Sequence, residues 1–249
     1  MIFFLDFSLS ERVELTAMRP MYGLQTWFCD AGEHDLRSPR MTMVFLSNVL
    51  GLRPFLLGGG ARVRYVAETH IPDVHDCVVK AIPAAREDEL EASVLVSQCP
   101  ENVSKLLAFI LTDSITYLIY RYSGTTVTTL PDIGRGELTR WFSEDGRWDT
   151  LLRDIATAVR SMRQFGIIHV DWKLANLTYD GHCFTVIDFG TVLFTRVSEA
   201  TTFGREIISA TSDENTLIRL AFTQMAPSFG FSRYPELQAR MEAAAAQVN

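Results

Sequence analysis

The stretch from Gly166 to Gly190, GIIHVDWKLANLTYDGHCFTVIDFG, constrains the fold of this chain more than any other part of its sequence. Two apolar runs, Ile167-Ile168 and residues 184–187, are short and bounded by polar residues, so both are predicted to be strands. The loop between them, with the residue that follows the second run, concentrates side chains that bind ions or move protons: His169, Asp171, Lys173, Asn176 and Asp188. The fold must therefore present one polar loop between two apolar strands.

Side chains of these types suit the transfer of a phosphoryl group. The phosphates of ATP need a cation to neutralise them, and Mg²⁺ prefers oxygen ligands such as the side chains of Asn176 and Asp188. A hydroxyl acceptor needs a carboxylate that orients it and accepts its proton, which is the role we expect for Asp171. Lys173 would balance charge on the transferring phosphoryl group. One segment thus supplies the catalytic and the metal-binding groups.

The same segment resembles the protein-kinase-like superfamily, and more specifically the eukaryotic-type Ser/Thr protein kinases. Residues 169–176 are similar to the catalytic loop H-R-D-x-K-x-x-N, and Asp188-Phe189-Gly190 matches the metal-binding triplet of that family. A lysine two positions after the aspartate is the variant typical of Ser/Thr kinases. The resemblance implies an active kinase that uses ATP and Mg²⁺, with Asp171 and Lys173 in catalysis and Asn176 and Asp188 on the metal.

A glycine cluster in the first half of the chain resembles the glycine-rich phosphate loop of the same family. Gly58 and Gly60 occupy the first two glycine places, whereas Val63 stands in the third. Lys80 ends the strand-like run VVK, where the family places the lysine that binds the α- and β-phosphates. Because side chains alternate along a strand, Val78 shares a face with Lys80 and would cover the adenine.

An acidic residue on the following helix is expected to hold Lys80 in place by a charge-assisted contact. Glu91 is the first candidate, because Val94 and Leu95 follow it on the same side of the helix, and Glu89 is the second. The alternative is that both glutamates only solvate the helix.

Residues 118–124, LIYRYSG, resemble the hinge between the two lobes of a kinase. The backbone groups of Arg121 and Ser123 would then bind adenine, with Tyr120 at the back of the pocket. The resemblance implies an α+β, protein-kinase-like two-lobed fold, with a β-rich N-lobe and a mainly helical, shortened C-lobe. The expected organisation is an N-terminal extension over residues 1–45, an N-lobe over 46–122 and a C-lobe over 123–249.

The hydrophobic pattern predicts the secondary structure around these motifs. We expect strands over residues 62–66 and 77–82, a helix over 84–98, a hairpin made from 105–111 and 115–122, and a helix over 148–165. The last helix has apolar residues at a spacing near 3.6 and ends before Gly166.

The end of the chain departs from the family pattern. Only 59 residues follow Gly190, and Ala226-Pro227-Ser228 is a poor substitute for the A-P-E triplet that closes an activation segment. We therefore expect a C-lobe that is truncated or rebuilt after residue 190, as in compact kinases of large DNA viruses, atypical protein kinases and relatives of the aminoglycoside kinases. Val170 replaces the arginine that pairs with a phosphorylated activation loop in many kinases, so we expect no such regulation here.

Composition narrows the partners and the compartment. The chain has 23 Lys and Arg against 30 Asp and Glu, a net charge of −7, so it lacks the basic footprint of a nucleic-acid-binding protein. The most apolar long window, residues 103–122, carries three charged residues, so no membrane span is expected. The four cysteines form no C-x-x-C pair, which favours a reducing compartment inside the cell, cytoplasmic or nuclear.

The sequence thus predicts an ATP- and Mg²⁺-dependent kinase that transfers the γ-phosphate to Ser or Thr of a protein substrate. Two alternatives stay open: a small-molecule kinase of the same fold, favoured by the short C-lobe, and a pseudokinase that acts as an interaction module.

Overall fold

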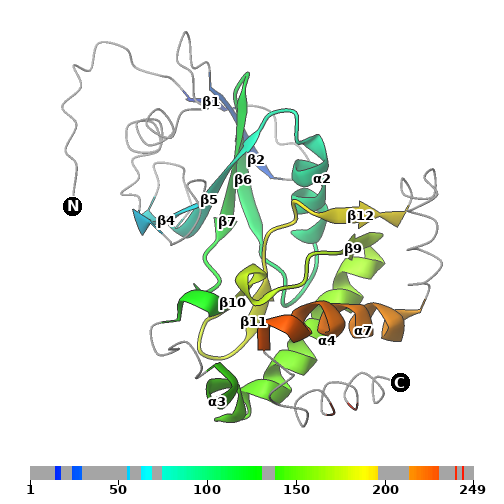
Figure 1. The fold of residues 1–249 in the computed structure, drawn as a ribbon. Helices are drawn as coiled ribbons and strands as arrows, with labels where there is room; N and C mark the ends of the chain where they lie inside the picture. The colour runs from blue at the N-terminus through cyan, green and yellow to red at the C-terminus, as the bar shows by residue number, and fades with distance from the viewer. Residues whose placement is uncertain are drawn as a thin grey trace. The chain divides into compact units, whose positions relative to one another are not determined.

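The computed structural model describes residues 15–17, 24–29, 55–56, 63–68, 75–130, 138–195 and 213–229, together with the single residues 239 and 243. These residues form a mixed α+β protein, which confirms the α+β class, while the kinase-like two-lobed arrangement stays a prediction (Figure 1). The chain divides into two compact units. The first comprises Met1–Ala85 and Leu107–Tyr120, and the second comprises Arg86–Leu106 and Arg121–Asn249.

The first unit is built on a mixed sheet of seven strands in the order β1-β2-β6-β7-β5-β4-β3. The pairs β1–β2, β3–β4 and β4–β5 are antiparallel, whereas β2 runs parallel to β6. The strands are β1 (Leu15–Ala17), β2 (Gln25–Cys29), β3 (Phe55–Leu56), β4 (Val63–Glu68), β5 (His75–Pro83), β6 (Leu106–Leu111) and β7 (Ile115–Arg121).

The centre of this sheet is apolar because β6 and β7 are nearly continuous apolar runs. Strands that are buried on both faces need such runs rather than an alternating pattern. Phe109, Tyr117 and Ile119 are fully buried. At the turn between the two strands, Thr112 donates its backbone N–H to the carbonyl of Ile115 at 3.0 Å. The strands expected between residues 62 and 82 and the hairpin expected after residue 105 are confirmed.

The first 45 residues contribute to this sheet. Strands β1 and β2 both lie within the segment that was expected to be an N-terminal extension, and residues 25–28 pair with residues 108–111 of β6. The glycine cluster at residues 58–60 lies outside the described residues.

The second unit combines helices with two small sheets. Its helices are α2 (Glu87–Val96), α3 (Leu138–Ser143), α4 (Arg147–Gln164) and α7 (Glu214–Met225). One sheet has the order β11-β10-β8 and the other pairs β12 with β9. Their strands are β8 (Thr125–Thr126), β9 (Ile167–His169), β10 (Leu177–Tyr179), β11 (Phe184–Val186) and β12 (Val192–Phe194). The helices expected over 84–98 and 148–165 are confirmed, each with shorter ends.

Helix α4 has one face buried within the second unit. Its buried residues recur at helical spacing, among them Leu151, Ile155, Val159 and Met162. The helix ends at Gln164. Two residues later, Gly166 has a left-handed φ of 69°, and a Cβ atom there would meet the Thr195 hydroxyl at 2.9 Å. The chain therefore turns sharply at Gly166 and enters β9.

Helix α7 lies alongside α4 in Figure 1. Asp213 caps its N-terminus by accepting the backbone N–H of Thr216 at 2.9 Å. Arg160 of α4 and Glu214 of α7 form an ion pair at 2.5 Å. None of the helices within the described ranges is long and apolar enough to cross a membrane.

Candidate functional site

Strand pairing brings the two halves of the predicted site together. Strand β9 ends at His169, and the polar loop, which contains a 3-10 turn over Leu174–Asn176, follows it directly. Strand β12 follows the triplet at 188–190 and pairs antiparallel with β9, with Val192 opposite His169. The triplet and the polar loop therefore emerge from neighbouring strands at the same end of a two-stranded ladder.

His169 links the loop to the triplet. Its side chain is buried, with 2% exposure, and its Nε2 lies 2.9 Å from the carbonyl oxygen of Asp188. Its Nδ1 lies 3.3 Å from the backbone N–H of Asp171, which donates to it. A ring that accepts at Nδ1 and donates at Nε2 is neutral. Burial lowers the pKa of His169, which favours the same neutral state.

Asp171 is held through one of its two carboxylate oxygens. Lys173 Nζ lies 2.6 Å from Oδ2, and Asn176 Nδ2 donates to the same oxygen at 3.0 Å. Within the described residues, both side-chain hydrogen bonds of this carboxylate are made by Oδ2 and not by Oδ1. Asp171 and Lys173 are both partly exposed, with 35% and 46% of their side chains accessible. The second oxygen is thus the one that would meet an acceptor hydroxyl.

Asn176 is almost completely buried, with 4% exposure. Its amide nitrogen also donates to the backbone carbonyl of Asp171 at 2.9 Å. Since the nitrogen is committed to Asp171, the amide oxygen is the atom that would ligate a cation. Asn176 and Asp171, which the sequence placed in one loop, are therefore in direct contact.

Asp188 adopts a backbone conformation that is unusual for a residue with a side chain. Its φ is 66°, in the left-handed region, which costs a non-glycine residue about 1–2 kcal/mol. Its Oδ1 accepts the backbone N–H of Gly190 at 3.3 Å, and the side chain is exposed. Phe189 points the other way, is 1% exposed, and contacts the ring of His169 edge-on. Such strain tends to persist where function requires a particular orientation.

Residues at the start of helix α2 contact the triplet at 188–190. Arg86, just before the helix, donates from a guanidinium nitrogen to the carbonyl of Gly190 at 2.5 Å. Glu89 is buried, with 3% exposure, and its Oε2 lies 3.5 Å from the Arg86 guanidinium. A Cβ atom on Gly190 would come within 3.0 Å of the same oxygen. Glu89, the second candidate for the acidic partner of Lys80, is thus the glutamate that lies against the triplet.

Glu91 is half-buried and, two positions further along the helix, lies on a different side of α2 from Glu89. Lys80 and Val78 are half-buried on β5 of the first unit, where they pair with Val63 and Tyr65. The ion pair between Lys80 and a glutamate stays a prediction.

The hinge residues are only partly available for adenine. The backbone N–H of Arg121 donates to the carbonyl of Lys105 at 2.8 Å, so this N–H is not available to bind a base. Ser123 is half-buried, and its hydroxyl lies 3.0 Å from that of Thr178 on β10. Gly58 and Gly60, the expected phosphate-loop residues, lie outside the described residues.

The donor set fits Mg²⁺ better than a tightly caged metal. Within the described ranges, no three His, Cys, Asp or Glu side chains lie close enough to hold a metal ion by themselves. Mg²⁺ commonly takes only one or two protein oxygens and completes its shell with phosphate oxygens and water. The Asp188 carboxylate and the Asn176 amide oxygen would supply such a pair.

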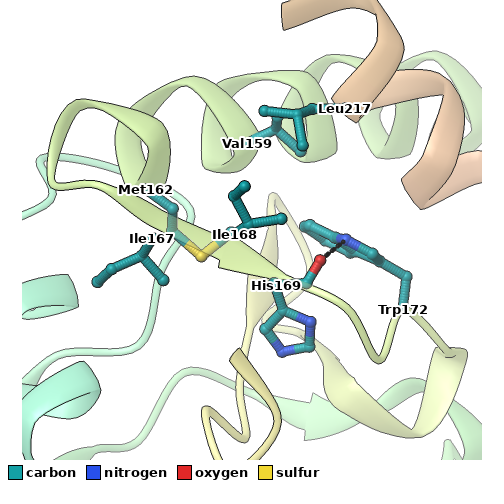
Figure 2. Close-up of a pocket in the computed structure, with 7 residues that line it drawn as sticks. All are labelled: Val159, Met162, Ile167, Ile168, His169, Trp172 and Leu217. Atoms are coloured by element: carbon teal, nitrogen blue, oxygen red, sulfur yellow. Dashed lines mark hydrogen bonds between the residues drawn. The ribbon is translucent and has the colours of Figure 1, made fainter. Parts of the chain in front are cut away.

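A small cavity lies beneath the loop, where β9 meets α4 and α7 (Figure 2). Its volume is about 10 Å³, which is room for about one water molecule and not for a nucleotide. His169 and Trp172 form its polar side, and the indole N–H of Trp172 donates to the backbone carbonyl of His169 at 2.8 Å. The cavity is therefore a small packing gap beneath the loop and not a ligand site. Its lining residues are Val159, Met162, Ile167, Ile168, His169, Trp172 and Leu217.

Neither a protein-family model nor a curated protein matches this chain. The function is therefore to be inferred from the motifs and from the contacts among their residues.

Proposed function

We propose that this chain is an ATP- and Mg²⁺-dependent phosphotransferase with a protein-kinase-like fold, which transfers the γ-phosphate to Ser or Thr of a protein. The observation that carries the proposal is the double hydrogen bond of His169, which joins the segment of Asp171 to that of Asp188. A loop with a catalytic carboxylate and a triplet with a metal-binding carboxylate have to be held together for phosphoryl transfer, because both act on the same phosphate.

The division of the chain supports the two-lobed form of this fold. The chain passes between the two units three times, and its last passage, between Tyr120 and Arg121, falls inside the segment expected to be the hinge. The sheet-rich first unit would correspond to the N-lobe and the second unit to the C-lobe. Helix α2 belongs to the second unit, although the boundary expected from the sequence placed it in the N-lobe.

Each residue of the site has a distinct role in the proposed reaction. The acceptor hydroxyl would donate its hydrogen bond to Oδ1 of Asp171, which takes the proton as the oxygen attacks the γ-phosphorus and ADP leaves. Lys173 holds Oδ2 of that carboxylate and faces the developing negative charge. Asn176 and Asp188 would hold Mg²⁺, which supplies charge neutralisation on the phosphates when it is bound. Lys80, Val78 and the backbone of the hinge would hold the nucleotide.

The nature of the acceptor distinguishes two candidate functions. Lys173 favours a protein substrate, because a lysine at this place is typical of Ser/Thr kinases. The poor match of Ala226-Pro227-Ser228 to the A-P-E triplet favours a small-molecule kinase instead. We place the protein substrate first, since Lys173 contacts the catalytic carboxylate directly.

A transfer assay with radiolabelled γ-phosphate tests the proposal. The purified chain is incubated with ATP and Mg²⁺ and either a mixture of generic acceptor proteins or a panel of small hydroxyl metabolites. Label on Ser or Thr of protein supports the first candidate, and label on metabolites only supports the second. Nucleotide binding without transfer to either acceptor refutes the phosphotransferase and leaves a pseudokinase. No change in melting temperature with millimolar ATP or ADP and Mg²⁺ refutes nucleotide binding itself.

A further inference from the structure

Helix α7 makes a polar contact with the catalytic loop that no sequence motif announces. The side chain of Gln224 accepts, at its Oε1, the backbone N–H of Trp172 at 3.1 Å. The two residues are 52 positions apart, and Trp172 follows Asp171 directly. An N–H group must meet an acceptor, so the contact requires the amide oxygen of Gln224 rather than its nitrogen.

The contact completes a clamp on the peptide unit that joins Asp171 to Trp172. The carbonyl side of this peptide is Asp171 O, which accepts from Asn176 Nδ2 at 2.9 Å. The N–H side is Trp172 N, which donates to Gln224. A peptide unit is planar, so two hydrogen bonds on opposite edges fix its rotation. That rotation sets ψ of Asp171, and with it the backbone from which its carboxylate projects.

Both ends of the contact rest on packed structure. Gln224 lies one turn beyond Ala221 and two turns beyond Leu217 on the same face of α7, and both of those residues are buried. Trp172 is 4% exposed and lines the cavity of Figure 2 together with Leu217. The helix packs on α4, where Arg160 and Glu214 also form a partly exposed ion pair. Gln224 therefore projects from a fixed platform.

We propose that Gln224 is a positioning residue that fixes the peptide between Asp171 and Trp172 and so aims the Asp171 carboxylate at the acceptor hydroxyl. The inference rests on the proposed function, because it assigns Gln224 a part in the same phosphoryl transfer. Helix α7 belongs to the part of the chain where the family pattern is lost, and this role connects α7 directly to the catalytic loop. Gln224 does not touch ATP, metal or acceptor in this role.

Three variants separate this role from a general contribution to folding. Gln224→Glu keeps an acceptor oxygen at the same place, whereas Gln224→Met keeps the length of the side chain and removes the strong acceptor. Thr223→Ala, on the exposed face of the same helix, is the matched control. Each variant is made as a single substitution in the full chain, and Gln224→Met is also combined with Asp171→Asn.

The first readout is amide hydrogen exchange of Trp172, followed by NMR, because it reports the contact without any need for activity. Wild type, Gln224→Glu and Thr223→Ala should protect this amide alike, and Gln224→Met should speed its exchange about tenfold or more. The second readout is phosphoryl transfer. Gln224→Met should lower kcat about ten- to a hundredfold, because a misplaced catalytic group costs a rate factor of that size, and leave KM for ATP within about twofold.

The double variant gives the sharpest test. If Gln224 acts through Asp171, Gln224→Met should cost no further rate once Asp171 is Asn, whereas a purely structural defect would still lower the residual rate. Unchanged Trp172 exchange in Gln224→Met, equal rate losses in both Asp171 backgrounds, or failure of Gln224→Glu to restore the rate would each overturn the inference while the wild type remains an active kinase. A wild type without any transfer would instead refute the proposed function, and the catalytic role of Gln224 with it.

Discussion

Replacing Asp188 by Asn, Gly and Ala separates its backbone conformation from its chemistry. Asp188 has a φ of 66° and accepts the N–H of Gly190 at 3.3 Å. Asn retains tolerance of left-handed φ and a side-chain acceptor. Gly loses the acceptor and removes the steric strain, and Ala loses the acceptor and keeps the strain. All three remove the carboxylate that would hold Mg²⁺.

Two contributions set the expected changes in the free energy of unfolding: the strain of the left-handed backbone and the hydrogen bond to the N–H of Gly190. Left-handed φ costs a residue with a Cβ about 1–2 kcal/mol relative to Gly. A hydrogen bond contributes about 0.5–1.5 kcal/mol net, and one at 3.3 Å belongs at the low end of that range. Asp188→Gly should therefore change the free energy of unfolding by less than about 1 kcal/mol, because the relief of strain offsets the lost bond. Asp188→Ala should be less stable than Asp188→Gly by about 1–2 kcal/mol. Asp188→Asn should match the wild type.

Urea denaturation measures these differences, and the melting temperature with and without Mg²⁺ and ATP measures the function. All three variants should lose the Mg²⁺-dependent part of the stabilisation by ATP, whatever their own stability. The reasoning is wrong if Asp188→Ala unfolds at the same urea concentration as Asp188→Gly, since the left-handed backbone would then not exist. It is also wrong if Asp188→Gly keeps the full Mg²⁺-dependent shift.

Other expected outcomes concern His169, Gly190, Thr191 and Lys80. Because the pKa of His169 is lowered in the folded chain, the unfolded chain binds more protons than the folded one below the ordinary histidine pKa of about 6.5. The free energy of unfolding should therefore fall as pH drops from about 7 to 5. His169→Gln should flatten this part of a plot of unfolding free energy against pH. In Gly190→Ala the added Cβ would press against the carboxylates of Glu89 and Asp188. Because both side chains are able to shift, the melting temperature should change little while the transfer rate falls. A variant with the Mg²⁺·ATP affinity and the transfer rate of the wild type would contradict the close approach. Phosphatase treatment of the chain and Thr191→Ala should leave the rate within about twofold, since Val170 offers no cation to a phosphate; a tenfold drop, about 1.4 kcal/mol in the barrier, would show that another basic residue reads a phosphate. Lys80→Met should impair transfer even where adenine analogues still protect the chain from unfolding, and unaltered transfer would remove Lys80 from the site.

The elements that the sequence predicted well are those with a strong local period. Helix α4 shows its apolar face in the spacing of Leu151, Ile155 and Val159, and Gly166 marks its end. Strands β6 and β7 are continuous apolar runs separated by a polar turn, so they could be recognised without any knowledge of the rest of the fold. The polar loop and the triplet at 188–190 were singled out by their residue types and by their resemblance to kinase motifs.

What the sequence missed depends on contacts between distant residues. Strand β2 runs parallel to β6, about 80 positions away, and nothing local in residues 1–45 indicates that pairing. The binding of adenine by the backbone of Arg121 stays a prediction, but only the fold reveals that its N–H donates to the carbonyl of Lys105. Gln224 is one polar residue in an amphipathic helix, and its contact with Trp172 has no signature in the sequence.

The choice between Glu89 and Glu91 shows the same limit within one helix. Val94 and Leu95 pointed to the side of Glu91. Val94 is buried but Leu95 is only half-buried, and Glu89, Ala92, Ser93 and Val96 are buried as well. The rotation of a helix about its axis is set by what it packs against. Here Arg86 and Gly190 lie on the side of Glu89, and α2 has no strong apolar stripe from which the sequence could fix that rotation.

The most direct measurement of the central claim is a comparison of Asp171→Asn with the wild type in two assays on the same preparation. Asparagine keeps the shape of the side chain, but it does not accept the proton of the acceptor hydroxyl. Asp171→Asn should bind ATP with Mg²⁺ as the wild type does, by the shift in melting temperature, and should transfer radiolabelled γ-phosphate at least about a hundredfold more slowly. Equal transfer by the two proteins, or a loss of nucleotide binding as large as the loss of transfer, would contradict the assignment of Asp171 as the catalytic base.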